Sequence, residues 1–173
     1  MTVLIGPSGF GPSSGSLIIH SAPKAVLSHV QWSIAEVIGS PISIHWEKQH
    51  LAPACFRTEL NWRGVVGTGS KLVSTLRGWH YLIFELHESA GNGSDGSLYM
   101  FAPELGLFHG TVGPHGDLMI NENQIKRVLK ENSKPIEMYD AIERLLGKEW
   151  DEFLEPFREK AFNEDGLDAR LSV

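Results

Sequence analysis

This sequence of 173 residues has almost no cysteine and no long apolar run. The single cysteine, Cys55, excludes an intramolecular disulfide and a cysteine-rich zinc site, which is typical of proteins in a reducing compartment. No apolar run approaches the roughly 20 residues of a membrane-spanning helix. The first residues also lack the basic and apolar regions of a signal peptide. These absences predict a soluble cytoplasmic protein without a membrane partner.

The composition and the distribution of charge narrow the fold and the partners. Hydrophobic residues make up 42% and charged residues 21% of the chain, as in ordinary globular domains, so a mainly disordered or coiled-coil architecture is excluded. The net charge of -6 arises after residue 96, since acidic and basic side chains balance before it. An acidic chain without a basic stripe lacks the attraction that dominates nucleic-acid affinity, so nucleic acid is not an expected partner.

The first half of the chain alternates strand-like and helical patterns. Residues 1–15, rich in Gly, Pro and Ser from residue 6 onward, are expected to form a flexible arm. Strands are then predicted at residues 16–21, 42–49, 55–63 and 81–88, and helices at residues 24–38 and 70–77. The order of elements predicts an α+β fold with a ferredoxin-like βαββαβ core over 16–96, in which an antiparallel sheet of order 4-1-3-2 carries both helices on one face.

An extension of strands and helices is predicted over residues 97–162. Three short strands are expected at residues 97–102, 105–112 and 117–120. Asn121 with Gln124 forms a plausible capping pair for one helix, and Pro135 is expected to open another. A third helix carries an apolar stripe of Trp150, Phe153, Leu154 and Phe157. We expect this stripe to dock on the rest of the chain, Pro156 to end or kink its helix, and a polar tail over 163–173 to be frayed.

The glycine-rich segment 64–72 is the first candidate for binding chemistry. Ser70 and Lys71 stand in the reverse order from that of a phosphate-binding P-loop, so a nucleotide triphosphatase is not expected. A turn that leads into a helix can still hold an anion on free backbone N–H groups, which here would involve Gly67, Thr68, Gly69, Ser70 and Lys71. The alternative is that the hydroxyl of Thr68 or Ser70 simply caps the helix.

The predicted sheet has a polar face opposite its helices, formed by His20, His45, Glu47, Arg57, Glu59, Asn61, Glu85 and His87. In the expected strand order, His20 lies beside Glu59 on one side and His87 on the other. Such imidazoles and carboxylates can ligate a metal or transfer a proton. The histidines are nevertheless dispersed and no HExxH motif is present, so we expect no metal and no cofactor. The alternative for this face is contact with solvent or with a protein partner.

Few residues are candidates for catalysis, and several are candidates for a partner contact. No GxSxG motif is present, and Cys55 begins a strand without a predictable base, so no catalytic residue is assigned. Trp32 lies outside the apolar arc of its helix, which indicates a second contact with the C-terminal helices or with another protein. The candidate partner contacts are Trp32, Trp150, Phe153 and Phe157.

Several segments in order resemble the DUF3145 family, a set of actinobacterial proteins without an assigned activity. They are HSAP (20–23), HVQW (29–32), GTGSKLVSTLRGW (67–79), SDGS (94–97), PELGLFHG (103–110) and KEWDEFLEPFR (148–158). The resemblance extends from Ser16 to Arg158. It implies a cytoplasmic protein, carries over no catalytic residue, and favours a partner in lipid metabolism.

Two functions therefore stay open. The first is a non-catalytic binding or regulatory protein that acts through contacts with another protein or with a second copy of itself. The second is a binder of, or an enzyme on, a small anionic metabolite, which would use the Gly67–Lys71 turn or the face of His20, Glu59 and His87.

Overall fold

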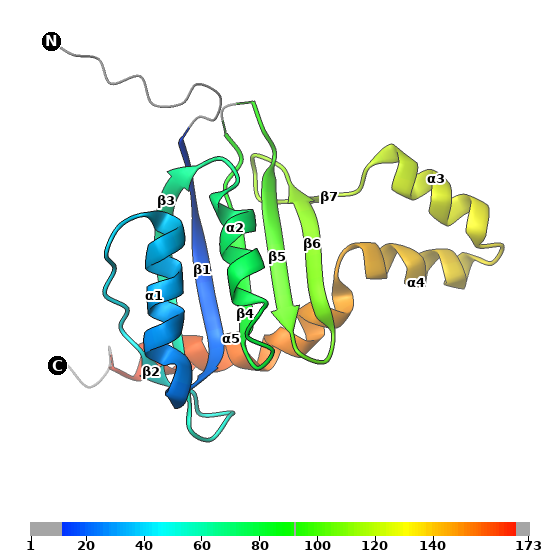
Figure 1. The fold of residues 1–173 in the computed structure, drawn as a ribbon. Helices are drawn as coiled ribbons and strands as arrows, with labels where there is room; N and C mark the ends of the chain where they lie inside the picture. The colour runs from blue at the N-terminus through cyan, green and yellow to red at the C-terminus, as the bar shows by residue number, and fades with distance from the viewer. Residues whose placement is uncertain (1–11, 92, 169–173) are drawn as a thin grey trace, which may run out of the picture.

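The computed structural model describes residues 12–91 and 93–168, with side chains described as far as Arg158. Within these residues the chain forms a seven-stranded antiparallel sheet of order β2-β3-β1-β4-β5-β6-β7 and five α-helices (Figure 1). The strands are β1 (Pro12–Pro23), β2 (Glu47–Lys48), β3 (Cys55–Val65), β4 (Ile83–Glu88), β5 (Gly96–Ala102), β6 (Gly106–Val112) and β7 (Leu118–Met119). The helices are η1 (Lys24–Val26), α1 (Leu27–Ile38), α2 (Thr68–Leu76), α3 (Glu122–Glu131), α4 (Pro135–Leu145) and α5 (Lys148–Asp168).

The prediction of an α+β fold is confirmed, and so is the order of the first four strands. Starting from β4, the sheet runs β4-β1-β3-β2, and every neighbouring pair is antiparallel. The strands β5, β6 and β7 continue the same sheet beyond β4. The predicted extension therefore supplies strands to one continuous sheet.

Two strand predictions differ from the structure. The segment 42–49 alternates polar and apolar residues, but only Glu47 and Lys48 pair with β3. The expected flexible arm is wrong for residues 12–15, because β1 begins at Pro12 and these residues pair with residues 62–65 of β3. Fixing these residues in a strand costs conformational entropy, and their Gly, Pro and Ser side chains do not offset this cost by burial. Backbone hydrogen bonds to the neighbouring strand offset it instead. Residues 1–11 of the expected arm lie outside the described residues.

One face of the sheet carries α1 and α2 and forms the main core (Figure 1). Alternate residues of the central strands, such as Leu17, Ile19 and Phe84, have no exposed surface. They meet the apolar sides of the two helices, which bury Val30, Ile34, Leu72, Val73 and Leu76. The helix α1 ends at a left-handed glycine cap, since Gly39 has a φ of 78° and donates its N–H to the carbonyl of Ala35.

The opposite face is covered at one end by α5 (Figure 1). Leu154 is fully buried against Met100 of β5 and Phe108 of β6, and Trp150 and Phe153 pack around them. The predicted docking of the C-terminal stripe on its own chain is therefore confirmed. The helix does not end at Pro156 but continues to Asp168, so residues 163–168 are helical where a frayed tail was expected; the rest of that tail, 169–173, lies outside the described residues.

The helices α3 and α4 form an arm that projects from the edge of the sheet (Figure 1). They pack on each other, and α4 contacts α5. The predicted capping pair is confirmed, because Asn121 accepts the N–H of Gln124 and the side chain of Gln124 accepts the N–H of Asn121. Among the described helices, none is both long enough and apolar enough to cross a lipid bilayer.

Candidate functional site

The glycine turn before α2 already holds an anion, and that anion is the carboxylate of Glu88. The backbone N–H of Gly67 donates to Glu88 Oε1 at 3.1 Å, and the hydroxyl of Ser13 donates to the same oxygen at 2.8 Å. A carboxylate at this position is favoured by the positive end of the helix dipole. Neither predicted hydroxyl cap is present: the side chain of Thr68 makes no capping bond, and Ser70 Oγ donates instead to the carbonyl of Gly67.

The glycines of this segment make room for Glu88 and for the helix itself. A Cβ on Gly69 would lie 2.5 Å from Glu88 Oε2, and a Cβ on Gly64 would lie 2.4 Å from Thr68 Oγ1. Gly67 adopts a φ of 91°, which a residue with a side chain rarely adopts. These positions therefore need glycine to pack α2 closely on the sheet, with Lys71 left exposed at the surface.

The register of β1 does not pair the residues of the second predicted site with one another, and it is irregular around His20. The register of β1 shifts between Ile19 and Ala22 against β3, and between Ile19 and Ser21 against β4. Before these shifts, Glu59 lies opposite Ile18, and His87 lies opposite Ser16. Neither residue pairs with His20, so the strand register does not gather His20, Glu59 and His87 at one point. A shift of one residue at a bulge redirects the side chains that follow it.

His20 instead contacts Glu85, which the sequence had placed on the same face. His20 is 1% exposed, and its Nε2 lies 2.6 Å from Glu85 Oε1. Arg158 of α5 donates to both oxygens of Glu85, at 2.9 and 2.5 Å, and to Asp151 Oδ1 at 2.6 Å. The ring of Phe157 covers His20, with the two ring centroids 5.9 Å apart. These contacts hold α5 on the sheet.

The charges in this cluster are strongly coupled. Burial by itself raises the pKa of Glu85, but the hydrogen bonds with His20 and Arg158 outweigh burial and lower this pKa to about 2. The hydrogen bond with Glu85 raises the pKa of Arg158 above its ordinary value, although partial burial acts in the opposite direction. Both groups therefore remain charged, and Glu85 is an ion-pair partner rather than a general acid or base at neutral pH.

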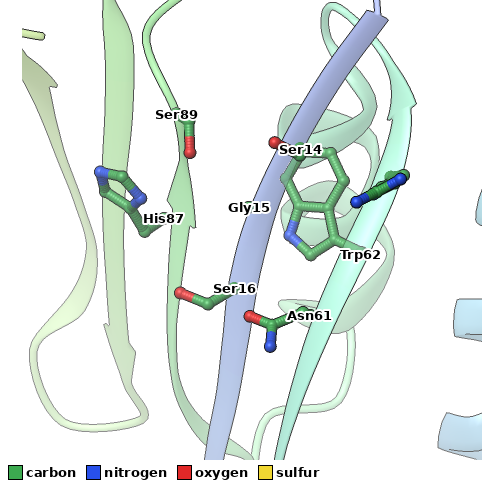
Figure 2. Close-up of a pocket in the computed structure, with 8 residues that line it drawn as sticks. Ser14, Gly15, Ser16, Asn61, Trp62, His87 and Ser89 are labelled. Carbon is green, nitrogen blue, oxygen red and sulfur yellow. The ribbon is translucent and has the colours of Figure 1, made fainter.

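The part of this sheet face that α5 leaves open contains a polar groove of about 550 Å³ (Figure 2). Ser14 and Ser16 come from β1, Asn61 and Arg63 from β3, and His87 and Ser89 from β4 and the residue after it. Gly15 and Trp62 complete the lining. We refer to this set of eight residues as the sheet groove.

The sequence analysis identified only part of the sheet groove. Asn61 and His87 were placed on the polar face, whereas Ser14 and Ser16 were assigned to a flexible arm or to no site. Extending the two-residue alternation of β1 back to Pro12 would have brought both serines onto this face. No group of three or more His, Cys, Asp or Glu residues in the described part of the chain is placed to hold a metal ion.

The candidate partner residues divide into two groups. Trp150, Phe153 and Phe157 are engaged inside the chain: Trp150 Nε1 donates to the carbonyl of Gly106 at 3.0 Å, and the rings of Phe153 and Phe157 stack at 6.0 Å. Trp32 is 73% exposed, so the C-terminal helices do not cover it. Of the two contacts considered for Trp32, this exposure gives no support to the one with the described part of the C-terminal helices, and the contact with another protein stays a prediction.

The arm of α3 and α4 exposes several large apolar side chains. It is not among the partner contacts that the sequence pattern indicates. Its exposed large apolar side chains are Ile125, Leu129, Ile136, Tyr139 and Ile142. Val128 is buried on α3, and no residue of α4 is buried. Only the structure shows that the sheet does not cover these side chains.

The family model described as "Protein of unknown function (DUF3145)" matches residues 16–166. The match covers most of the chain, and the chain belongs to this family. The resemblance noted from the sequence segments is therefore confirmed. No curated protein and no solved structure matches the chain.

Proposed function

For this member of the DUF3145 family, we propose a non-catalytic binding or regulatory function that acts through protein–protein contacts of the arm formed by α3 and α4. The exposed apolar surface of this arm carries the proposal. Ile136 is 63% exposed and Leu129 is 58% exposed, although each belongs to a regular helix. Leaving such side chains in water costs about 1.5–3 kcal/mol each relative to burial. Exposed apolar side chains that gather on one part of a protein mark interaction sites.

The spacing of these residues supports a helical docking surface. Ile125 and Leu129 are four residues apart on α3, and Ile136, Tyr139 and Ile142 recur every three residues on α4. Each helix therefore presents an apolar stripe in addition to the residues that join the two helices. A partner protein would bind this surface in the way that an amphipathic helix binds an apolar groove or helix face.

The charged residues of α3 and α4 indicate which charges the partner surface carries. The basic residues of α3 outnumber its acidic residues by three to two, whereas α4 has three acidic residues and one basic residue. The expected partner surface is therefore apolar at its centre, with charges of both signs at its rim. A second copy of the chain can offer such a surface, and so can a different protein.

Trp32 is a candidate for a separate contact. It lies on α1, and Figure 1 shows α1 and the arm at opposite ends of the sheet. A protein that uses both surfaces would contact two partners, or a partner and a second copy, without competition between them.

Site-specific crosslinking tests the proposal. A photo-reactive amino acid in place of Ile136 should yield one dominant adduct in the native cell, whereas the same residue in place of Ser74, which is exposed on α2, should not. An adduct of twice the chain mass would identify self-association, and another mass would identify a different protein. The double variant Leu129→Glu/Ile136→Glu should abolish the adduct formed from a photo-reactive residue at Tyr139. Equal crosslinking from Ile136 and Ser74, or none from Ile136, would contradict the proposal.

Two finer assignments belong with this proposal. We propose a ferredoxin-like topology for residues 16–96, supported by the order of β1 to β4 and by the position of α1 and α2 on one face (Figure 1). We also propose a cytoplasmic location, supported by the single cysteine.

The alternative function, an enzyme or binder at the Gly67–Lys71 turn, loses support because Glu88 occupies the turn.

A further inference from the structure

The polar side chains of the sheet groove make no hydrogen bond or ion pair with the described residues. They are the hydroxyls of Ser14, Ser16 and Ser89, the amide of Asn61, the guanidinium of Arg63 and the imidazole of His87. The other end of the same face is different, because His20, Glu85 and Arg158 bond to one another beneath α5. Polar side chains without a partner among the described residues therefore gather at the part of this face that α5 leaves open.

The side chains that line the groove favour a ligand with a negative charge. Each of the six side chains can donate a hydrogen bond, Arg63 carries a fixed positive charge, and no Asp or Glu lines the groove. The adjacent carboxylate of Glu88 is engaged on the other side of the sheet with Gly67 and Ser13. Although the chain has a net charge of -6, no carboxylate side chain lines this groove. Donors that surround a guanidinium in this way match a carboxylate or a phosphate group.

The floor of the groove is rigid, which keeps these donors in position. Gly15 lies at its centre, where a Cβ would be 1.9 Å from the carbonyl oxygen of His87 and 2.6 Å from the ring of Trp62. Trp62 is 2% exposed, and its buried Nε1 has no hydrogen-bond partner among the described residues. Figure 2 shows Ser16, Asn61 and His87 on three adjacent strands around this point. Donors held on paired strands lose little entropy when a ligand binds.

We propose that the sheet groove binds a small organic oxyanion through a terminal carboxylate or phosphate group. Arg63 supplies the charge, and Ser16, Asn61 and His87 supply hydrogen-bond donors to the anionic oxygens. Glu59 lies on β3 two residues before Asn61 and limits the site toward α5, because its carboxylate repels an extended anion. This inference does not depend on the arm, which lies at the far edge of the sheet (Figure 1).

A titration of the full chain followed by NMR tests the proposal, with inorganic phosphate and acetate as separate probes. The expected result is a saturable shift of the backbone amides of residues 14–16, 61–63 and 87–89 with at least one probe, and little change at residues 67–71. A response to phosphate alone would define a phosphate ligand, and a response to acetate alone a carboxylate ligand. Loss of a charge-assisted hydrogen bond should make Arg63→Gln bind about tenfold more weakly.

Two further variants separate this site from general charge effects. Arg77→Gln removes the same charge from the exposed end of α2 and should leave the affinity unchanged. Asn61→Asp preserves the size of an exposed side chain, so the fold should be kept, but it places a carboxylate in the groove and should abolish binding. The proposal fails if neither probe shifts the groove amides, if the shifts do not saturate, or if Arg63→Gln and Arg77→Gln weaken binding equally.

Discussion

Arg158 of α5 and Glu85 of β4 are 73 residues apart in the sequence and form a bidentate ion pair, with Nη2 2.5 Å from one carboxylate oxygen and Nε 2.9 Å from the other. The side chain of Glu85 is 13% exposed and that of Arg158 is 25% exposed. The same carboxylate contacts buried His20. This pair therefore joins the C-terminal helix to the two central strands of the sheet.

Arg158→Ala should destabilise the fold, because it leaves the carboxylate of Glu85 without its main charge partner. We expect a loss of about 2 kcal/mol in the free energy of unfolding, below the value for a fully buried pair because the arginine is partly exposed. Urea unfolding followed by circular dichroism measures this change. Arg77→Ala, at an exposed position, is the matched control and should change the free energy by less than about 0.5 kcal/mol. Equal effects of the two variants would show that the Arg158–Glu85 pair does not stabilise the docked helix.

The stability that Glu85 contributes should depend on pH in the acid range. Its pKa falls from an ordinary 4.5 to about 2 in the folded chain, so the folded state binds the proton less readily than the unfolded state. The contribution is complete above about pH 5 and is lost as the pH falls through 4.5 toward about 2. The stability difference between the parent chain and Glu85→Gln, measured by urea unfolding at pH 6, 4 and 3, should shrink accordingly. A difference that stays constant over this range would contradict the ion pair.

Gly69→Ala should destabilise the chain even though alanine favours a helix by about 1 kcal/mol over glycine. The added Cβ would lie 2.5 Å from Glu88 Oε2 and 3.1 Å from Leu86 Cδ2, so we expect a net loss of about 1–3 kcal/mol. The penalty should become smaller in a Glu88→Ala background, where the nearest atom is absent. Thermal unfolding of the four chains of this double-mutant cycle measures the coupling.

Gly78→Ala is the control for Gly69→Ala, since its nearest neighbouring atom would be at an ordinary 3.4 Å. If Gly69→Ala behaves like Gly78→Ala, α2 does not pack on Glu88 as closely as the structure shows.

Leu154→Ala should cost about 3 kcal/mol of stability, because Leu154 is fully buried between α5 and the sheet. The exposed neighbour Glu155 supplies the control, and Glu155→Ala should be nearly neutral. Denaturant unfolding compares the two variants. A neutral Leu154→Ala would mean that α5 does not complete the core, and the stripe of Trp150, Phe153, Leu154 and Phe157 would again become a candidate partner surface.

Much of the fold was predictable because it depends on local periodicity. Leu17 and Ile19 recur at the two-residue period of a strand, Val30 and Ile34 share a helical face, and Asn121 with Gln124 forms a capping box whose two bonds join neighbouring residues. Each of these patterns is complete within a few residues. The strand order also followed, since few arrangements allow two helices to cover one face of a four-stranded sheet.

The candidate sites were less predictable, because their residues meet through pairing that local patterns do not encode. The register of β1 places Glu59 opposite Ile18 and His87 opposite Ser16, and the polar residues 12–15 enter the sheet through backbone hydrogen bonds. The bond from Gly67 to Glu88 spans 21 residues.

The sequence by itself determined most of the elements, the acidic C-terminal part, the apolar stripe of α5 and the family. Only the tertiary structure decided which polar groups satisfy one another and which stay free. Glu85 finds Arg158, Glu88 fills the glycine turn, and the donors around Ser16 remain unpaired. The physical reason is that a hydrogen bond requires its two atoms within about 3 Å. Distances on that scale between residues far apart in the chain are set by strand register and by the docking of α5.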